Sequence, residues 1–311
     1  MFAAIAALRD AFRELSAGRV TMPLRARLPV PDHDGIFLVM PALIPAAQQM
    51  AVKVVSVYPE NPGQGLPSIH AVVLMFDPRD GRPLALLDGE TLTALRTGAA
   101  SGVATGLLAR PEAATAAVFG AGAQGRTQLE AVATVRRLTR AWIFDPAVET
   151  ATAFAREMTD QLGFPVDIAP DPAAALRQAD VVCTATTSGR PVFTDRDVPP
   201  GTHINAVGAY TPASHEIPPA TVARALVVVD QRQACLAEAG DLLIPREQGL
   251  LAADFLPAEL GEILDDRRPG RSSPDEITLF KSVGVAVQDA AVAGRVLDAA
   301  AEIGLGREVM L

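Results

Sequence analysis

Two cationic side chains stand in stretches that are otherwise apolar, and both could bind an anionic substrate. Lys53 lies within residues 51–57, a strand-like run in which nearly every neighbour is apolar. At the edge of a sheet, Lys53 would point outward and guard against aggregation. Facing a cavity, it would be desolvated, which lowers its pKa and equips it to bind an anion or donate a proton.

Arg96 lies in a predicted helix beside Gly98, Gly102 and Gly106, which recur every four residues. Each glycine costs a helix about 1 kcal/mol relative to alanine, so the ridge indicates close approach by a packed element or by a ligand. Packing alone would explain the glycines. It would not explain Arg96, whose planar fork is suited to gripping a carboxylate or a phosphate.

A glycine-rich turn at residues 120–125 has the spacing of a dinucleotide-binding turn, between a predicted strand and a predicted helix. Gly120 would permit the tight turn, Gly122 would let the backbone approach a pyrophosphate, and Gly125 would let helix and strand pack closely. The next strand ends at Asp145, about 25 residues further on, where an acid binds the adenosine ribose. The alternative is a merely structural turn.

Asp145 also bears on the choice of cofactor. Its carboxylate would repel a 2′-phosphate, and no Arg or Lys follows it directly, so NADH is favoured over NADPH. Arg126, just past the turn, could reach toward a phosphate or could be a solvated helix residue.

The elements that must position these residues change character along the chain. Up to residue 112 we expect antiparallel strands, a turn at 77–81 and a helix capped by Asp88. From residue 113 strands alternate with helices, which predicts a doubly wound parallel sheet over 113–285. A helix of small residues at 285–303 should pack back on the first part. The expected strands are 36–40, 51–58, 69–77, 84–87, 116–119, 141–144, 180–184, 202–207 and 225–229, and the expected helices there are 124–138 and 148–162.

Composition excludes several other classes of protein. The chain has 311 residues, of which 49% are hydrophobic, and this length favours two globular domains over disorder. The net charge of −9, without a basic stripe, argues against nucleic acid. No apolar run is long enough for a membrane span, and the apolar start is followed at once by Arg9 and Asp10, so we expect an N-terminal amphipathic helix in a cytoplasmic protein.

No metal site is expected either. Cys183 and Cys235 have no partner at metal-ligand spacing and should be buried thiols. His203, at the start of a predicted strand, is more simply a structural residue than a catalytic one.

These stretches together resemble the ornithine cyclodeaminase/mu-crystallin family across essentially the whole chain. The resemblance rests on six segments in the family's order: Met40-Pro41-Ala42 and residues 53–61, 94–101, 120–125, 203–208 and 279–284. It implies a homodimer in which the N-terminal strands build a shared barrel. It also implies an α/β fold in which residues 1–112 and 286–311 form a discontinuous substrate-binding and dimerisation domain, with residues 113–285 as the Rossmann domain.

The resemblance assigns roles to individual residues. Lys53 and Arg96 correspond to the family's catalytic, substrate-contacting lysine and arginine, and Arg25 and Tyr210 are further candidates for the substrate site. Contacts to NADH or NADPH are implied for Thr97, Gly120, Gly122, Ala123, Gln124, Gly125, Asp145, Thr184, Thr186, Val207 and Ser282.

One departure from the family pattern indicates the subfamily. Cyclodeaminases carry an aspartate where this chain has Tyr210, and a tyrosine cannot serve as a carboxylate base near neutral pH. The chain is therefore most similar to the ketimine reductase branch. This implies NAD(P)H-dependent reduction of delta-1-pyrroline-2-carboxylate or delta-1-piperideine-2-carboxylate to L-proline or L-pipecolate.

Other readings remain open on the sequence alone. Within the enzymes, the alternatives are an alanine dehydrogenase-like amino-acid oxidoreductase and an ornithine cyclodeaminase. From another class comes a mu-crystallin-like binding protein that keeps the dinucleotide without the chemistry, although the presence of both Lys53 and Arg96 argues against it.

Overall fold

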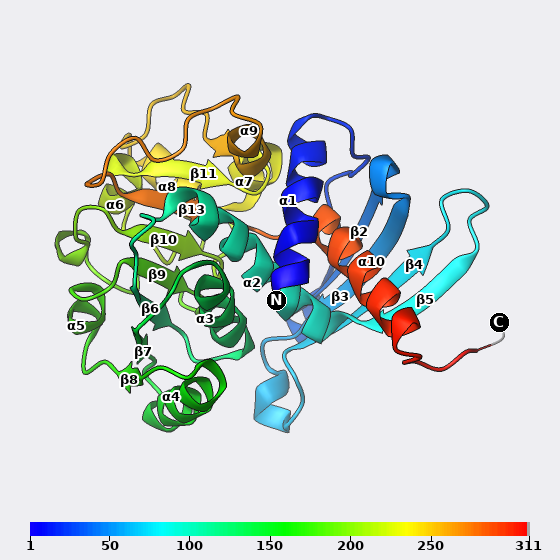
Figure 1. The fold of residues 1–311 in the computed structure, drawn as a ribbon, viewed down its shortest axis with the longest axis horizontal. Helices are drawn as coiled ribbons and strands as arrows, with labels where there is room; N and C mark the ends of the chain where they lie inside the picture. The colour runs from blue at the N-terminus through cyan, green and yellow to red at the C-terminus, as the bar shows by residue number, and fades with distance from the viewer. Residues whose placement is uncertain (310–311) are drawn as a thin grey trace.

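The first part of the chain forms an antiparallel sheet of five strands in sequential order (Figure 1). The computed structural model describes residues 1–309, and at position 62 the backbone alone. The strands are β1 (Ala26–Val30), β2 (Gly35–Ile44), β3 (Gln49–Val57), β4 (Ile69–Phe76) and β5 (Pro83–Asp88). Short 3-10 turns at Pro31–His33, Pro45–Ala47 and Asn61–Gln64 join the first four.

The second sheet is parallel and has eight strands in the order β12-β11-β13-β10-β9-β6-β7-β8. From β6 the chain runs outward through β7 and β8, then crosses back to place β9 on the other side of β6. Such a reversal is the point where open α/β sheets bind ligands. The strands are β6 (Thr115–Phe119), β7 (Arg140–Phe144), β8 (Val166–Ile168), β9 (Val181–Thr184), β10 (His203–Ala206), β11 (Leu226–Val229), β12 (Ala258–Glu259) and β13 (Thr278–Lys281).

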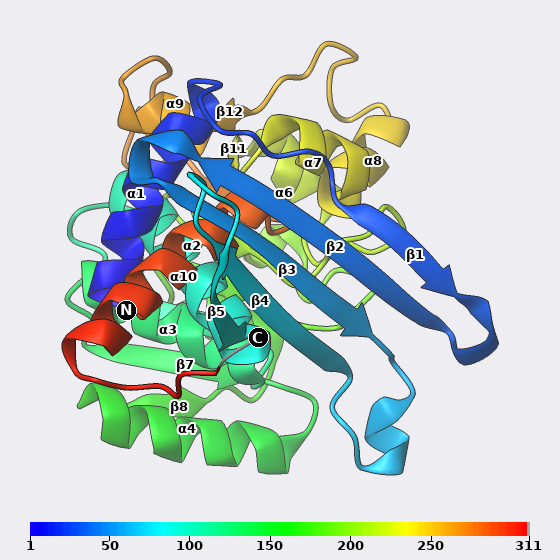
Figure 2. The same cartoon turned by 90° about the vertical axis from the view of Figure 1, so that its right-hand side faces the viewer.

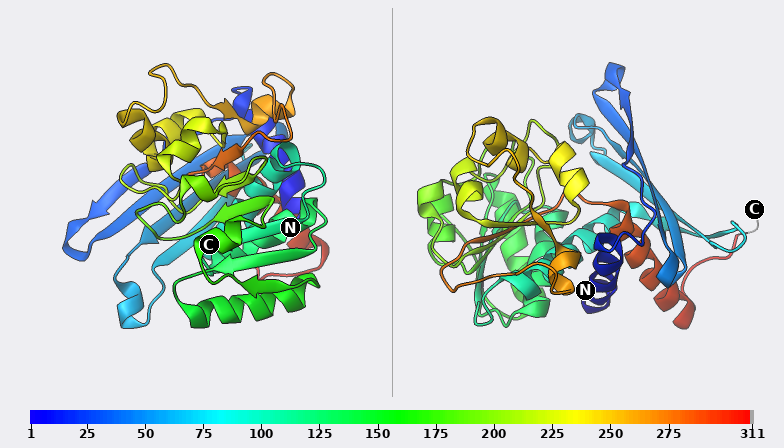
Figure 3. Two further views of the ribbon diagram at one scale, coloured as in Figure 1. Left: turned by 90° about the vertical axis from the view of Figure 1, so that its left-hand side faces the viewer. Right: turned by 90° about the horizontal axis from the view of Figure 1, so that it is seen from above.

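Three helices lie between the two sheets: α1 (Phe2–Ser16), α2 (Gly89–Leu108) and α10 (Ala286–Glu302) (Figures 1 and 3). The side chain of Asp88 caps α2 by accepting from Glu90 N and Thr91 N, as predicted. The remaining helices accompany the parallel sheet: α3 (Ala123–Val135), α4 (Val148–Leu162), α5 (Pro172–Leu176), α6 (Pro219–Arg224), α7 (Arg232–Glu238), α8 (Gly240–Glu247) and α9 (Leu260–Leu264).

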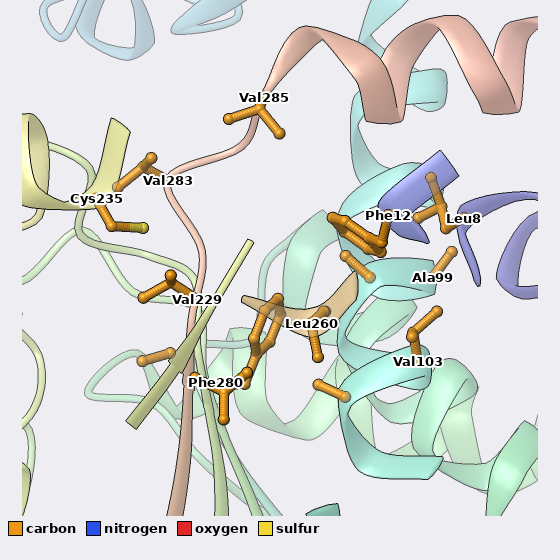
Figure 4. Close-up of a cluster of buried hydrophobic side chains, with 14 of the residues drawn as sticks. Leu8, Phe12, Ala99, Val103, Val229, Cys235, Leu260, Phe280, Val283 and Val285 are labelled. Carbon is orange, nitrogen blue, oxygen red and sulfur yellow. The ribbon is translucent and has the colours of Figure 1, made fainter. Parts of the chain in front are cut away.

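A continuous apolar core joins these layers (Figure 4). Leu8 and Phe12 of α1 are buried in the same cluster as Val103 of α2, Leu260 of α9 and Phe280 of β13. Full burial of such a side chain contributes about 1.5–3 kcal/mol. The central helices therefore bind the first sheet to the second.

Several expectations about the fold are confirmed. The antiparallel strands, the change to alternating strands and helices, and the return of the last helix onto the first sheet are all present. Cys183 and Cys235 are buried free thiols, and burial raises the pKa of Cys183 to about 12. None of the helices within residues 1–309 combines the length and hydropathy needed to cross a membrane.

Other expectations are wrong. Lys53 is not on an edge strand, because β3 is the third of five strands. The helix expected to reach residue 138 ends at Val135. Strands β1, β8, β12 and β13 were not expected. The strand expected at 36–40 continues to Ile44 through Pro41.

The neighbours of Pro41 explain why β2 tolerates a proline. Backbone groups of Leu43 pair with Thr21 on the β1 side, so those of Pro41, two residues earlier, face the same side. The β1 ladder has already ended there, at the pair of Ala26 with Val39. The missing N–H of Pro41 therefore costs no ladder hydrogen bond.

The glycines of α2 are explained by packing. A Cβ at Gly98 would lie 2.5 Å from the backbone oxygen of Thr127 in α3, and one at Gly102 would meet Ile5 of α1. At Gly106 no described atom lies within 4 Å of such a Cβ. The ridge thus serves the approach of two helices, which leaves Arg96 to be explained separately.

Substitution at Gly98 and Gly106 should have opposite effects on stability. We expect Gly98→Ala to lower the free energy of unfolding by about 1–3 kcal/mol, because the backbone of α3 cannot yield to the new methyl group. Gly106→Ala, the matched control, should raise it by up to about 1 kcal/mol through helix propensity. Urea denaturation measures both; equal effects at the two positions would contradict this explanation.

Candidate active site

Lys53 faces inward from β3 and meets a carboxylate from the other end of the chain. Its Nζ lies 3.0 Å from Oδ1 and 3.0 Å from Oδ2 of Asp289, in the first turn of α10, and 3.5 Å from Oγ1 of Thr93. The side chains of Lys53 and Asp289 are only 2% and 1% exposed. Since a buried charge requires a partner, each of the two groups depends on the other.

Arg96 shares the same carboxylate. Its Nε donates to Asp289 Oδ1 at 3.1 Å, and its Nη1 donates to Gln288 Oε1 at 2.7 Å. Within residues 1–309, no hydrogen-bond acceptor is found for its Nη2. A Cβ at Gly284 would lie 2.5 Å from Arg96 Nη1, and the φ of +74° there also favours glycine. The guanidinium is thus held between α10 and the backbone that precedes it.

The surroundings of Lys53 shift its proton affinity into the physiological range. Burial lowers the pKa of Lys53 to about 8, opposed by the nearby Asp289 carboxylate and assisted by the positive charge of Arg96. A lysine with such a pKa can donate a proton near neutral pH. The burial and the lowered pKa expected of Lys53 are therefore found, and its role toward a substrate stays a prediction.

A second carboxylate connects this cluster to the parallel sheet. Asp230, which follows β11, accepts from Ser282 Oγ at 2.6 Å, from Gly284 N at 3.0 Å and from Gln288 Nε2 at 3.3 Å. Gln288 in turn accepts from Arg96. Ser282, predicted to contact the cofactor, is therefore tied to the segment that positions Arg96.

Arg25 lines a pocket between the two sheets, together with Met40, Glu238 and Gly284. Met40 is paired with Lys53 across strands β2 and β3, and Gly284 packs against Arg96, so the pocket adjoins the cationic cluster. Arg25 Nε donates to Glu238 Oε1 at 3.2 Å, and Nη2 pairs with Glu238 Oε2. Arg25 therefore has a carboxylate partner from α7.

The glycine-rich turn has the geometry that a dinucleotide requires. Gly120 has a φ of +99°, and a Cβ there would lie 2.5 Å from Ala185 O, in the loop after β9. A Cβ at Gly125 would collide with Gly120 O. At Gly122 no described atom lies within 4 Å of a Cβ, so this side of the turn is open.

The start of α3 offers donors at this open side. The helix begins at Ala123, so the N–H groups of its first turn have no intrahelical acceptor and can bind a pyrophosphate. The residues present therefore fit a dinucleotide, and the predicted roles of the three glycines agree with their surroundings.

The two residues that bear on the choice of cofactor behave differently. Asp145 lies after β7, and its carboxylate accepts from Ala121 N at 2.9 Å and from Ala147 N at 2.9 Å. Arg126 pairs with Glu157 at 2.8 Å and covers the ring of Phe154. Its reach toward a phosphate stays a prediction.

The opposite side of the crevice is formed by the ends of β9 and β10. Thr184 is the last residue of β9, and Thr186 lies in the loop that follows it. Val207 N, just after β10, donates to Thr184 O at 3.0 Å. Thr97 is buried on α2, where its hydroxyl donates to Thr93 O at 2.8 Å. Tyr210 is half-buried against the apolar core. Cofactor and substrate contacts of these residues stay predictions.

His203 is structural, as predicted. It is buried at the start of β10 between Thr278 Oγ1 at 2.9 Å and Asn205 Oδ1 at 3.2 Å. Burial lowers the pKa of His203 to about 3. Over the described residues, no three His, Cys, Asp or Glu side chains are grouped so that they could hold a metal ion.

Sequence reasoning missed the carboxylates that face the cations. Asp289 gave no local signal, because an acid in the first turn of a helix is common without any site. Asp230 follows a strand and Glu238 ends a helix, and neither position is unusual for an acidic residue. A signal did exist for Lys281, a charged residue in the apolar run 277–283, as Lys53 is in its own strand.

A dinucleotide-type turn at the reversal of a parallel sheet, together with a buried pair of cations between the two sheets, is typical of an NAD(P)-dependent oxidoreductase. The family model described as ornithine cyclodeaminase/mu-crystallin family matches residues 1–304. The chain belongs to this family.

Individual relatives are similar over nearly their whole length. Delta(1)-pyrroline-2-carboxylate reductase of Bacillus cereus is 39% identical over 300 residues, covering 96% of this chain and 92% of the relative. The solved structure of the Thermococcus litoralis delta(1)-pyrroline-2-carboxylate reductase in complex with NADH and L-proline has a TM-score of 0.95 and 42% identity, covering 98% and 95% of the two chains. An archaeal alanine dehydrogenase dimer with bound NAD has a TM-score of 0.93 and 32% identity, covering 100% and 95%.

Proposed function

We propose that this protein reduces a small cyclic imino acid, delta-1-pyrroline-2-carboxylate or its six-membered homologue, to L-proline or L-pipecolate. NADH serves as the reductant, with NADPH as the alternative. The similarity to reductases of this name supports the proposal. The observation that carries it is that Lys53 and Arg96 share one carboxylate, while a nitrogen of Arg96 has no acceptor among the described residues.

Two cations of the buried cluster share a single carboxylate as their direct partner. Lys53 and Arg96 bring two cations, and Asp289 brings one carboxylate to both of them. Arg25 and Glu238 neutralise each other nearby. Nη2 of Arg96 has no acceptor within residues 1–309, so the guanidinium can bind a further carboxylate oxygen from a ligand. A small imino acid carries one carboxylate.

Each cation has a distinct task in the reaction. Arg96 binds the substrate carboxylate, since a guanidinium with an uncommitted nitrogen matches the geometry of a carboxylate. Lys53 donates a proton to the ring nitrogen while the imine carbon receives a hydride, so that C=N becomes CH–NH. The dinucleotide supplies that hydride when it is bound. Asp289 holds both cations in place and keeps Lys53 protonated.

The proposal predicts which substrates oxidise NADH. We expect turnover with delta-1-pyrroline-2-carboxylate or delta-1-piperideine-2-carboxylate without ammonia, because the imine is already formed. The measurement is NADH absorbance, with pyruvate plus ammonia assayed in parallel. Turnover only with pyruvate and ammonia would indicate an amino-acid dehydrogenase. Ammonia release from ornithine without net NADH consumption would indicate a cyclodeaminase, and no reaction at all would favour a binding protein.

The pH dependence tests the role of Lys53. Because its pKa is lowered to about 8, kcat/KM should fall as the pH rises through about 8, where the ammonium donor is lost. Asp289→Asn removes the carboxylate that raises this pKa, so the basic limb should move to lower pH. Gln288→Leu is the matched control: it removes a partner of Arg96 without a change of charge and should leave the limb in place. The assignment would be contradicted if the pH at which kcat/KM falls stayed the same or rose in Asp289→Asn.

A homodimer built through the first sheet is part of the proposal. One face of this sheet carries apolar rows across the strands, Val39–Val54–Val72 and Pro41–Val52–Leu74–Leu86, by register. Val72 and Leu86 are 40% and 67% exposed. Figure 2 looks onto this face, and the helices α2 and α10 lie behind it. An apolar surface of this kind fits a second copy of the chain.

The domain boundaries also belong to the proposal. We assign residues 1–112 and 286–311 to the substrate-binding and dimerisation domain and residues 113–285 to the dinucleotide-binding domain. Residues 310–311 lie outside the described part of the chain. A cytoplasmic location stays a prediction from the sequence.

A further inference from the structure

Glu216 is a fully buried carboxylate that the proposed reaction does not use. It lies in the segment between β10 and α6. Its Oε1 accepts from Thr186 N at 2.7 Å and from Thr186 Oγ1 at 2.8 Å. Its Oε2 accepts from Thr184 Oγ1 at 2.9 Å, from Gly208 N at 2.7 Å and from Ala209 N at 3.2 Å. One side chain therefore joins the loops after β9 and β10.

The position of Glu216 is itself fixed by a buried ion pair. Asp241 Oδ1 accepts from Glu216 N at 2.8 Å and from Ile217 N at 2.9 Å, and its Oδ2 lies 2.8 Å from Lys281 Nζ. Lys281 also donates to Ala209 O. Burial raises the pKa of Glu216, and the positive charge of Lys281 opposes that shift. Burial alone would lower the pKa of Lys281, but Asp241 and Glu216 outweigh it.

The loops leave no room for a side chain where Glu216 reaches them. A Cβ at Gly208 would lie 2.5 Å from Glu216 Oε1. In the loop after β9, Ala185 directly precedes Thr186, and its backbone packs against Gly120 of the dinucleotide turn. The hydrogen bonds of Glu216 therefore set where three loops stand relative to one another.

These loops border the part of the crevice that receives the nicotinamide. The strands run in the order β7, β6, β9, β10, with Asp145 after β7 and the glycine turn after β6. An acid after the second strand marks the adenosine end, and the turn marks the pyrophosphate. The nicotinamide end then falls at β9 and β10. We propose that Glu216 is a positioning residue that shapes this end of the crevice before the dinucleotide binds.

Asp180 offers a matched control at the opposite end of the same strands. Its Oδ2 accepts from Ala114 N at 2.9 Å, from Thr115 N at 3.1 Å and from Thr115 Oγ1 at 2.9 Å. Asp180 thus binds two backbone N–H groups and one threonine hydroxyl and pairs with Arg110, whereas Glu216 binds three backbone N–H groups and two threonine hydroxyls. It precedes β9, however, and lies at the amino ends of the strands, away from the crevice.

The test compares NADH affinity in Glu216→Gln and Asp180→Asn by fluorescence titration, with the thermal midpoint of each variant. In Glu216→Gln, the NH2 group of the new amide would face N–H and O–H groups of the two loops, which are donors themselves. We therefore expect the Kd for NADH to rise at least about tenfold, which is about 1.4 kcal/mol. In Asp180→Asn it should change less than about twofold. At saturating NADH, the KM for the imino acid should change less than about threefold in either variant.

Unchanged NADH affinity in Glu216→Gln would overturn the proposal, and so would an equal loss in both variants, which would indicate general destabilisation. Should Glu216→Gln fail to fold, Glu216→Asp decides. It keeps the charge for Lys281 but is too short to reach both loops, so weaker NADH binding supports the proposal and normal binding overturns it. The titration needs no imino acid, so its outcome is independent of the proposed substrate.

Discussion

The shared carboxylate of Asp289 is the interaction on which the rest of the structure depends. It binds Lys53 from a central strand of the first sheet and Arg96 from the helix that leads to the second sheet. Two buried cations without it would repel each other and lose their only carboxylate partner within the described residues. The carboxylate sits in the first turn of α10, where the helix dipole also favours negative charge. The chain must therefore return to the first sheet after completing the parallel one.

This return explains why the site lies between two sheets of different type. The parallel sheet supplies a reversal point and a turn that fit a dinucleotide, and the antiparallel sheet supplies the lysine. Asp230 and Gln288 connect the two, since the first lies after β11 and the second donates to it from α10. In the proposed reaction, the hydride comes from the side of the parallel sheet and the proton from the side of the antiparallel sheet. Neither sheet alone contains both.

Features that depend on residues close together in the sequence could be predicted, and features that depend on distant residues could not. The turn at residues 120–125, the cap at Asp88 and the odd charge at Lys53 each depend on near neighbours, so their patterns were readable. The edge alternative for Lys53 remained open because strand order is a long-range property. Asp289 and Glu216 could not be found, because Asp289 meets Lys53 across 236 residues and Glu216 meets Thr186 across 30 residues of the chain. The β2 strand was cut short at Pro41 because only its neighbours show that no hydrogen bond is lost there.

The central claim is that Arg96, which shares its one carboxylate partner with Lys53, binds the substrate carboxylate. The most direct measurement is the affinity of pyrrole-2-carboxylate, a planar ring acid that the enzyme should not reduce, for the NADH complexes of the wild type and of Arg96→Ala. The Kd for this acid should rise at least about tenfold in the variant, the equivalent of one lost charge-assisted hydrogen bond, while the Kd for NADH changes less than about twofold. Equal affinity of both proteins for the acid would contradict the account.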